Sequence, residues 1–329
     1  MSSRQVDGYE VHIVNGHAEL PKGVANIIGE QFKNCTSLTS VTIPSSVTKI
    51  GFDAFRNCTS LTSVTIPSSV TKISEGAFMG CTSLTSVTIP PSVTKIGAHA
   101  FRDCTSLTPV TVPSSVTKIG YEAFRGCSSL ISVTIPSSVT WISDGAFQFC
   151  SSLISVTIPS SVIKIGNFAF EECSSLTSVT IPSSVTKIGK YEFRGCSSLT
   201  LVTMPSSVTE IGDFAFEDCS SLISVAIPSS VTEIGRYAFN SCAITSITIP
   251  TTCTLEDDAL DPDVTITRLT PDRMEFCYRL ATFVRWRRRH KPQLFAWYER
   301  AALKIGSFST EGAGRKRDRD AFERDFAGA

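Results

Sequence analysis

A strict 23-residue period constrains this chain more than any other feature of its sequence. Cysteine recurs every 23 residues at ten successive positions, phenylalanine recurs with the same spacing, and proline follows it from Pro21 to Pro228. Such a period indicates that each unit is one structural repeat stacked on its neighbours. The length of 329 residues therefore does not imply two globular domains, because the core of a stacked array grows linearly. The cysteines are Cys35, Cys58, Cys81, Cys104, Cys127, Cys150, Cys173, Cys196, Cys219 and Cys242, and the phenylalanines are Phe32, Phe55, Phe78, Phe101, Phe124, Phe147, Phe170, Phe193, Phe216 and Phe239.

Each unit contains the pattern of a half-buried β-strand. Residues 58–80 read CTSLTSVTIPSSVTKISEGAFMG, and the segment SVTI alternates hydroxyl side chains with β-branched apolar ones. Alternation with a period of two predicts a strand with an apolar inner face and a hydroxyl outer face. Pro67 ends the strand because it has no N–H group to donate. The second half of the unit is predicted to be a tight turn and a short helical piece.

The apolar residues of one unit can be buried only by the next unit. They become a continuous core when successive coils pack on one another. The expected fold is a solenoid with one parallel β-strand per 23-residue coil.

The repeat also resembles a known family. Residues 104–124, CTSLTPVTVPSSVTKIGYEAF, follow the pattern C-x-x-L-x-x-V-x-I-P-x-x-V-x-x-I-G-x-x-A-F, which resembles the leucine-rich repeat of the BspA-like surface-antigen family. The resemblance spans residues 21–249. It implies the α/β class, a leucine-rich-repeat solenoid, and a binding surface of the kind that adhesins use, and it provides no catalytic residues.

Residues 1–20 are predicted to form an N-terminal tail and a capping hairpin. Asn15-Gly16 lies between two apolar runs, which is the strongest short signal for a hairpin. Ala18 precedes Val41 by 23 residues. We therefore expect the second strand of the hairpin to be the first rung of the solenoid.

The solenoid is predicted to occupy residues 21–267 and to end in a degenerate coil. In that coil Leu255 replaces the isoleucine of the repeat, and Ala259 and Leu260 replace the alanine-phenylalanine pair. Its acidic residues lack the spacing of an EF-hand calcium loop, so we interpret them as the polar surface of a capping coil.

Residues 268–306 are predicted to form a pair of helices that caps the open end of the solenoid. Thr270 is a candidate N-cap, with Pro271 at the first helical position, and Pro292 separates the two helices. The run RWRRRHK, from Arg285 to Lys291, is either a solvated helix end or a nucleic-acid patch. The charged tail at 307–329 is predicted to be disordered.

Charge and hydropathy exclude several function classes. The chain has 30 basic and 30 acidic residues, so its net charge does not favour a nucleic-acid or membrane partner. The first residues show no signal-peptide pattern, and no apolar run has the length of a membrane span. These observations predict a cytoplasmic location, in contrast to the surface-antigen resemblance.

The cysteines are predicted to be reduced and inert. Each cysteine of the series occupies the same buried corner of its coil, and the Cα–Cβ bonds of neighbours run parallel instead of converging as a disulfide requires. There is no CxxC motif, and the four histidines are scattered, so no metal or other cofactor is expected. No catalytic arrangement is evident, because the acidic pairs Glu171-Glu172 and Glu217-Asp218 have no partner base. The chain is therefore not expected to be an enzyme.

The best candidate for a partner site lies two residues before each phenylalanine of the core series. This position holds Asp53, Gly76, His99, Glu122 and Gly145, and then four consecutive aromatic residues, Phe168, Tyr191, Phe214 and Tyr237. Charged residues, Lys190, Asp213 and Arg236, precede three of them. The aromatic residues are interpreted either as stacking contacts between coils or as anchors for a partner.

Two further rows repeat along the chain. The outer row of serine and threonine hydroxyls is broken at Pro109, Leu201 and Ala226. A lysine row is interpreted as solvated, or alternatively as a site for an acidic partner. It consists of Lys49, Lys72, Lys95, Lys118, Lys164 and Lys187, with Trp141 between the fourth and fifth, and reverses sign at Glu210 and Glu233.

Three hypotheses for function follow. The first is a scaffold that binds a protein partner along the repeat surface. The second is adhesin-like binding of a periodic ligand (glycan, mineral or ice) to the hydroxyl lattice, which requires a flat strand face. The third is nucleic-acid binding by the basic run from Arg285 to Lys291.

Overall fold

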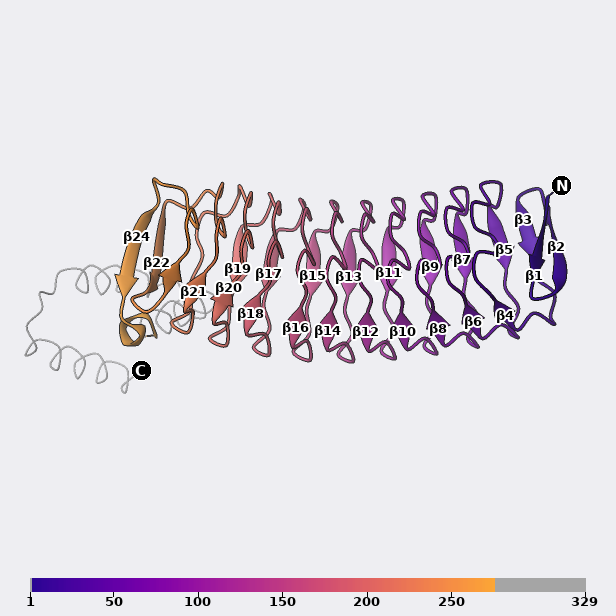
Figure 1. The fold of residues 1–329 in the computed structure, drawn as a ribbon, viewed down its shortest axis with the longest axis horizontal. Coiled ribbons are helices and arrows are strands. Elements are labelled where there is room, and N and C mark those ends of the chain that lie inside the picture. The colour runs from indigo at the N-terminus through magenta and orange to yellow at the C-terminus, as the bar shows by residue number, and fades with distance from the viewer. Residues whose placement is uncertain (1, 276–329) are drawn as a thin grey trace, which may run out of the picture. The chain divides into compact units, whose positions relative to one another are not determined.

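The structure is a computed structural model that describes residues 2–275 (Figure 1). The chain divides into two units, Met1–Glu275 and Phe276–Ala329, and the described residues belong to the first. Most of the predicted first helix lies outside the described residues, and so do the second helix, the basic run from Arg285 to Lys291 and the tail at 307–329.

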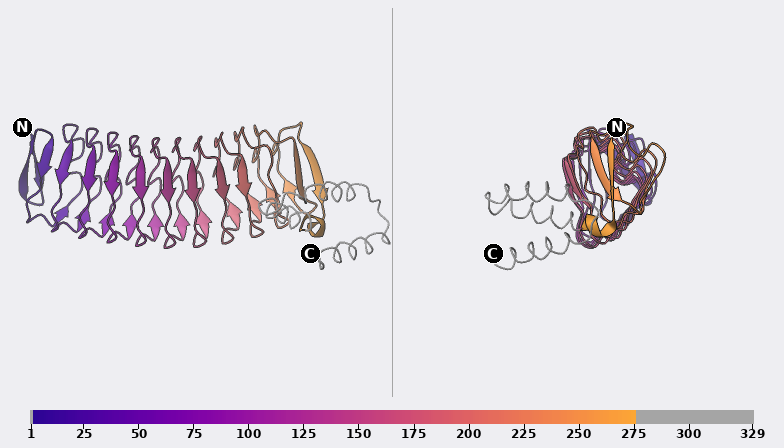
Figure 2. Two further views of the ribbon diagram at one scale, coloured as in Figure 1. Left: turned by 180° about the vertical axis from the view of Figure 1, so that it is seen from behind. Right: turned by 90° about the vertical axis from the view of Figure 1, so that its left-hand side faces the viewer.

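The first unit is a β-solenoid of about eleven coils that runs nearly straight (Figure 1). Viewed along its axis, the coils overlie one another (Figure 2). The predicted solenoid with parallel strands is confirmed. Most coils contain, in addition to the expected strand, a second strand of two residues.

An antiparallel hairpin covers the N-terminal end of the solenoid. Strand β2 (Tyr9–Val14) pairs with β3 (His17–Glu19), and Asn15 and Gly16 between them have φ of 50° and 81°. Strand β3 pairs in parallel with the next coil, with Ala18 opposite Val41, as predicted. Strand β1 (Ser2–Val6) pairs antiparallel with β2 and was not predicted, because its sequence SSRQV shows no apolar alternation.

The longer strands carry the Ser-Val-Thr segment and pair in register, with Val64 opposite Val87, for example. They form two sheets, of order β1-β2-β3-β5-β7-β9 and β11-β13-β15-β17-β19. The break between the sheets falls at Pro109, the first residue of β11, which has no N–H group to donate. The strands are β5 (Ser40–Thr42), β7 (Ser63–Thr65), β9 (Ser86–Thr88), β11 (Pro109–Thr111), β13 (Ser132–Thr134), β15 (Ser155–Thr157), β17 (Ser178–Thr180) and β19 (Leu201–Thr203).

Most short strands place one isoleucine in the core and one polar side chain outside; β14 has Trp141 as its outer residue, and β23 has Leu255 in place of isoleucine. They form a seven-stranded sheet from β4 to β16 and a four-stranded sheet of order β18-β20-β21-β23. The strands are β4 (Asn26–Ile27), β6 (Lys49–Ile50), β8 (Lys72–Ile73), β10 (Lys95–Ile96), β12 (Lys118–Ile119), β14 (Trp141–Ile142), β16 (Lys164–Ile165), β18 (Lys187–Ile188), β20 (Glu210–Ile211), β21 (Glu233–Ile234) and β23 (Thr254–Leu255).

The short helical piece predicted for each coil is wrong, because this segment forms hydrogen-bonded turns in the described coils. The N–H group of Phe55 donates to the carbonyl oxygen of Ala77 in the next coil at 2.8 Å, and Phe124 donates to Ala146 at 2.9 Å. These bonds between coils use donors that a helix would direct to its own preceding turn. Sequence periodicity within one unit does not reveal such bonds.

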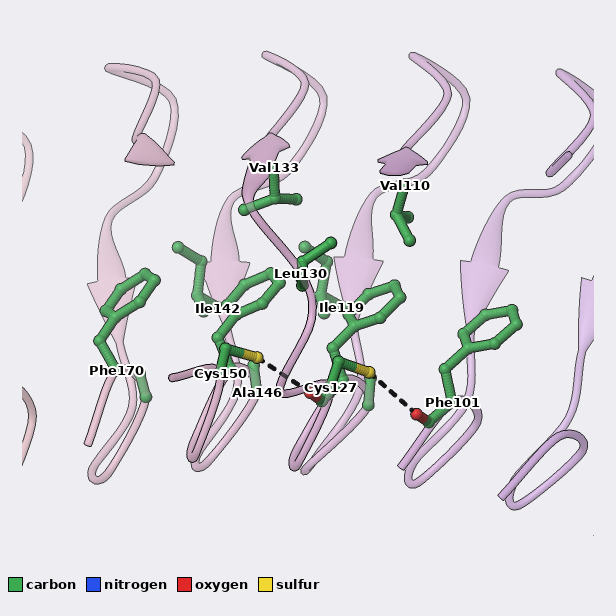
Figure 3. Close-up of a cluster of buried hydrophobic side chains, with 14 of the residues drawn as sticks. Phe101, Val110, Ile119, Cys127, Leu130, Val133, Ile142, Ala146, Cys150 and Phe170 are labelled. Atoms are coloured by element: carbon green, nitrogen blue, oxygen red, sulfur yellow. Dashed lines mark hydrogen bonds between the residues drawn. The ribbon is translucent and has the colours of Figure 1, made fainter. Parts of the chain in front are cut away.

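The core is a column of stacked phenylalanine rings beside a column of thiols. Neighbouring rings of the series have centroids 5.1–5.6 Å apart, and their planes lie within 8° of parallel. The Cys127 thiol donates to the carbonyl oxygen of Phe101 in the preceding coil at 3.2 Å, and Cys150 donates in the same way to Phe124 (Figure 3).

The thiols are inert for a physical reason. Burial raises the pKa of Cys150 to about 12, so the nucleophilic thiolate does not form near neutral pH. The eleven cysteines within residues 2–275 are free.

The degenerate last coil is confirmed. Leu255 of β23 lies opposite Ile234, and the carbonyl oxygen of Ala259 accepts from Phe239 at 2.9 Å. Strand β22 (Ser246–Pro250) pairs in parallel with β24 (Thr265–Leu269), which extends two residues beyond the predicted end of the solenoid at 267. A helical turn follows at 271–275, with Thr270 accepting from Met274 at 3.0 Å.

Candidate functional site

The predicted site lies on a tight turn that every coil makes two residues before its core phenylalanine. We call these equivalent positions the turn column. Its residues have φ between 48° and 64° in every coil from Glu30 to Asp258. This left-handed conformation suits glycine and, less well, asparagine and aspartate, and it costs other residues about 1–2 kcal/mol.

Four consecutive positions of the turn column carry aromatic residues, which we call the aromatic stripe. Phe168, Tyr191, Phe214 and Tyr237 have φ of 59°, 57°, 58° and 55°. Their rings stack, with centroid distances of 4.8 Å, 4.6 Å and 5.1 Å along the series. The structure therefore brings the four predicted residues together on one flank of the solenoid.

The aromatic stripe is open to solvent along its length. Phe168 is 36% exposed, and the other three side chains are partly exposed. The hydroxyl group of Tyr237 donates to Asp258 in the last coil, which raises the pKa of Tyr237. Part of each side chain thus remains available for contact with another molecule.

The charged residues beside the aromatic stripe are engaged with one another. Lys190 Nζ lies 2.6 Å from Asp213 Oδ2, and this contact lowers the pKa of Asp213. Arg236 donates its backbone N–H group to Asp213 and lies 3.8 Å from Asp257. Lys190 and Arg236 therefore border the stripe as members of a charge network.

Comparison with protein families decides how this array is classified. The model of the BspA type leucine rich repeat region, in six copies, matches residues 25–154 and 140–261. The matched residues make up more than half of the chain and contain every repeat that bears the aromatic stripe. The chain belongs to the BspA-type leucine-rich repeat family.

Solved structures of similar sequence are bacterial leucine-rich repeat proteins. The T. pallidum leucine-rich repeat protein TpLRR is 36% identical, covers 49% of this chain and 78% of its own, and has a TM-score of 0.48. A leucine-rich repeat protein from Bacteroides ovatus is 25% identical, with coverage of 77% and 92% and a TM-score of 0.45. A leucine rich cell surface protein from Faecalibacterium prausnitzii is 27% identical, with coverage of 84% and 97% and a TM-score of 0.37. A comparison with curated proteins found no match.

One coil of this BspA-type array departs from the repeat inside the core. Glu192 occupies the position that alanine holds in the neighbouring coils, and its side chain is 0% exposed. Oε2 accepts from the N–H group of Gly189 at 2.6 Å, whereas Oε1 has no hydrogen-bond partner among residues 2–275. Burial raises the pKa of Glu192 well above its usual range. This buried carboxyl directly follows Tyr191 of the stripe.

Arg194 forms ion pairs with both acidic pairs for which the sequence analysis found no partner. Arg194 Nε lies 2.6 Å from Glu217, and its Nη1 lies 3.2 Å from Glu171. Glu171 also accepts from Gln148 in the preceding coil. These carboxylates therefore join successive coils, which is a structural role.

Sequence reasoning missed Glu192 and Arg194, although aligning the repeats with one another reveals both. Glu192 replaces an alanine, and Arg194 lies 23 residues from both Glu171 and Glu217. Within residues 2–275, no group of three or more His, Cys, Asp or Glu side chains could hold a metal ion. In the same part of the chain, no helix has the length and hydropathy to cross a membrane.

Proposed function

We propose that this protein is a non-enzymatic interaction scaffold and that the aromatic stripe, bordered by Lys190 and Arg236, is its protein-binding surface. The observation that carries the proposal is the run of four stacked, partly exposed aromatic residues in the turn column, where other coils have glycine or a polar residue such as His99 or Glu122. The turn forms without an aromatic residue in those coils, so the fold does not require the stripe.

The energies show why stacking alone does not explain the stripe. Three stacked pairs contribute about 0.5–1.5 kcal/mol each. The left-handed conformation costs each of the four residues about 1–2 kcal/mol, and this total exceeds the contribution of the three stacked pairs. Stacking therefore gives no net gain over glycine. Partly exposed aromatic residues with flanking charge are typical of the anchors of protein interfaces.

Replacing two tyrosines by glycine separates binding from stability. In the Tyr191→Gly, Tyr237→Gly variant, the turn keeps a conformation that glycine adopts without strain, so we expect a nearly unchanged melting transition and loss of partner capture from the source lysate. The matched control is Tyr121→Ser, which removes a tyrosine that is 48% exposed and lies outside the stripe. A lower melting temperature with capture intact would show that the stripe only joins coils.

A second candidate function is adhesin-like binding of a periodic ligand, such as a glycan, to the hydroxyl lattice. It is supported by the straight course of the solenoid and by the register that places Ser63 opposite Ser86 and Thr65 opposite Thr88 (Figure 1). The lattice is continuous from β5 to β9 and interrupted at Pro109. Retention on insoluble crystalline polysaccharide that is lost in Thr65→Val, Thr88→Val would support this function, and equal retention would exclude it.

We also propose that the protein acts in the cytoplasm. The proposal follows the expectation from the sequence, and the free, buried thiols are compatible with it. Fractionation of source cells with an antibody against the repeats tests the proposal. Recovery at the cell surface would contradict it.

The possibility of nucleic-acid binding by the run from Arg285 to Lys291 stays a prediction. Salt-sensitive binding to DNA that disappears when these residues are neutralised would establish it.

A further inference from the structure

Five lysines form a straight cationic row on the short strands, which we call the lysine column. Its members are Lys49, Lys72, Lys95, Lys118 and Lys164. Parallel pairing places Lys72 opposite Lys95, and Lys95 opposite Lys118. Neighbouring strands in a sheet lie about 4.8 Å apart, and like charges directly opposite one another are destabilising.

No acidic side chain within residues 2–275 forms an ion pair with any lysine of the column. The next lysine of the row behaves differently, because Lys187 is bonded to Glu210 in the following coil. The row is therefore neutralised at its C-terminal end, whereas the five lysines of the column have no acidic partner among the described residues. An external anion is the missing partner that would relieve their repulsion.

Trp141 fills the one gap in the lysine column and holds the lysines on either side of it. Lys118 Nζ lies 4.2 Å from the centroid of the indole ring, and Lys164 Nζ lies 5.0 Å from it. Both distances are typical of cation–π contacts. The two ammonium groups therefore lie on the same indole ring, one from the coil before it and one from the coil after it.

The column is straight and bordered by hydroxyl groups. The six strands from β6 to β16 lie in one line (Figure 1), and five steps between them span about 24 Å. Each of the first four lysines follows an exposed threonine. The Thr94 hydroxyl donates to the Thr71 carbonyl oxygen at 3.4 Å, so its own oxygen can still accept.

These features favour a carbohydrate polyanion over a nucleic acid. Single-stranded nucleic acid binds to exposed aromatic rings on which bases stack, whereas the only ring in this row, Trp141, already lies between two ammonium groups. The backbone of a DNA duplex winds away from a straight row. An extended, unbranched polysaccharide offers anionic groups in line and hydroxyl donors beside them.

We propose that the lysine column binds an extended, unbranched anionic polysaccharide, with its sulfate or carboxylate groups at successive ammonium groups and its hydroxyls at the threonine row. The affinity falls as salt concentration rises, because binding releases the counterions of the polyanion. The lysine column and the aromatic stripe share no residue: the column ends at Lys164, and the stripe begins at Phe168 of the same coil.

The test compares two double variants of equal net charge in the full-length chain. Lys72→Gln, Lys95→Gln removes two members of the column, whereas Lys22→Gln, Lys187→Gln removes one lysine outside the row and the lysine already paired with Glu210. The probes are a defined dextran sulfate, uncharged dextran and a DNA duplex, measured by calorimetry at low and high salt.

We expect the column variant to bind dextran sulfate about 25-fold more weakly, since each lysine near an anionic surface contributes about fivefold. The control variant should bind within about twofold of the unmodified protein, and dextran should not bind. Thermal unfolding verifies folding, and the column variant should be at least as stable as the unmodified protein because a like-charge contact is removed. Equal losses in the two variants, unchanged binding in the column variant, or binding of the DNA duplex as tightly as dextran sulfate would each overturn the proposal.

Discussion

The N-terminal and C-terminal halves of the solenoid share one core and differ in two surface columns. Up to Gly145, the turn column contains charged residues, histidine and glycine, and the lysines of the short strands have no acidic partner within residues 2–275. From Phe168 to Tyr237, the turn column is aromatic, and the lysine row ends in the ion pair of Lys187 with Glu210. The halves therefore present different surfaces on the same backbone.

The same left-handed turn is secured by different interactions in the two halves. In the N-terminal half, buried Asp53 accepts from Arg56 at 2.9 Å, and Glu122 accepts from Arg102 at 2.6 Å. In the C-terminal half, ring stacking joins the coils, as between Tyr191 and Phe214. The stacking of coils therefore determines the core and the turn, whereas the outward-facing side chains can differ between the two halves.

The largest effect tests the shared core. Phe101→Ala in the N-terminal half and Phe193→Ala in the C-terminal half should each lower the free energy of unfolding by about 3–5 kcal/mol, through lost burial and the cavity left behind. Phe32→Ala should cost less, because its ring stacks on one neighbour only. The control is Phe52→Ala, at a side chain that is 48% exposed. Chemical denaturation measures all four, and clearly unequal losses at Phe101 and Phe193 would show that the halves do not share one core.

The second effect concerns a residue that has no counterpart in the N-terminal half. Glu192→Ala restores the alanine of the repeat and removes a buried carboxyl with an unpaired oxygen, so it should stabilise the protein by about 1–3 kcal/mol at neutral pH. Because folding raises the pKa of Glu192, its unfavourable contribution grows as pH rises above the unfolded value of 4.5 and levels off above the folded pKa. The difference between the variant and the parent should therefore be smaller at pH 4 than at pH 7. A difference independent of pH in denaturation would contradict this account, and Glu192→Gln serves as the uncharged isostere.

The third effect tests the ionic contacts of the N-terminal half. Asp53→Asn keeps a residue that tolerates the left-handed turn but removes the charge that Arg56 and Lys33 contact, so it should cost about 1–2 kcal/mol at low salt. The cost should shrink in 1 M salt because these contacts are partly solvated. Tyr191→Gly in the C-terminal half should show no such salt dependence. Equal salt dependence at both sites, measured by denaturation, would remove the distinction between the halves.

The smallest effect tests the lysine column itself. Lys95→Gln should stabilise the protein by about 0.2–1 kcal/mol at low salt, because it removes a like charge opposite two others. Lys187→Gln, which breaks the ion pair with Glu210, should be neutral or slightly destabilising. Thermal unfolding at two salt concentrations measures both, and a stabilisation of Lys95→Gln that survives 1 M salt would show a cause other than charge repulsion.

Several features of the fold could be predicted because each depends on residues close in sequence or on the repeat itself. The hairpin at Asn15-Gly16 requires two positive φ values, which that dipeptide accepts. The interruption at Pro109 reflects a missing donor, and Leu255 marks the last coil by replacing an isoleucine. The stacking of Tyr191 on Phe214 was likewise predictable, since both occupy one repeat position.

The amino-acid sequence by itself determined the length of the coil, the row of side chains that points into the core, and the solenoid fold. The 23-residue repeat and the alternation of polar and apolar residues along a strand can both be recognised without knowledge of the contacts between coils. Only the tertiary structure decided that the second half of each coil is a turn with a short strand, since the bond from Phe55 to Ala77 joins neighbouring coils. It also determined the environment of Glu192, whose carboxyl group is fully buried by the packed coils. In both cases the contact that decides the outcome lies between coils. The free energy of a hydrogen bond or of a buried charge depends on whether the group has a partner and whether it is in contact with solvent, and both depend on how the coils pack.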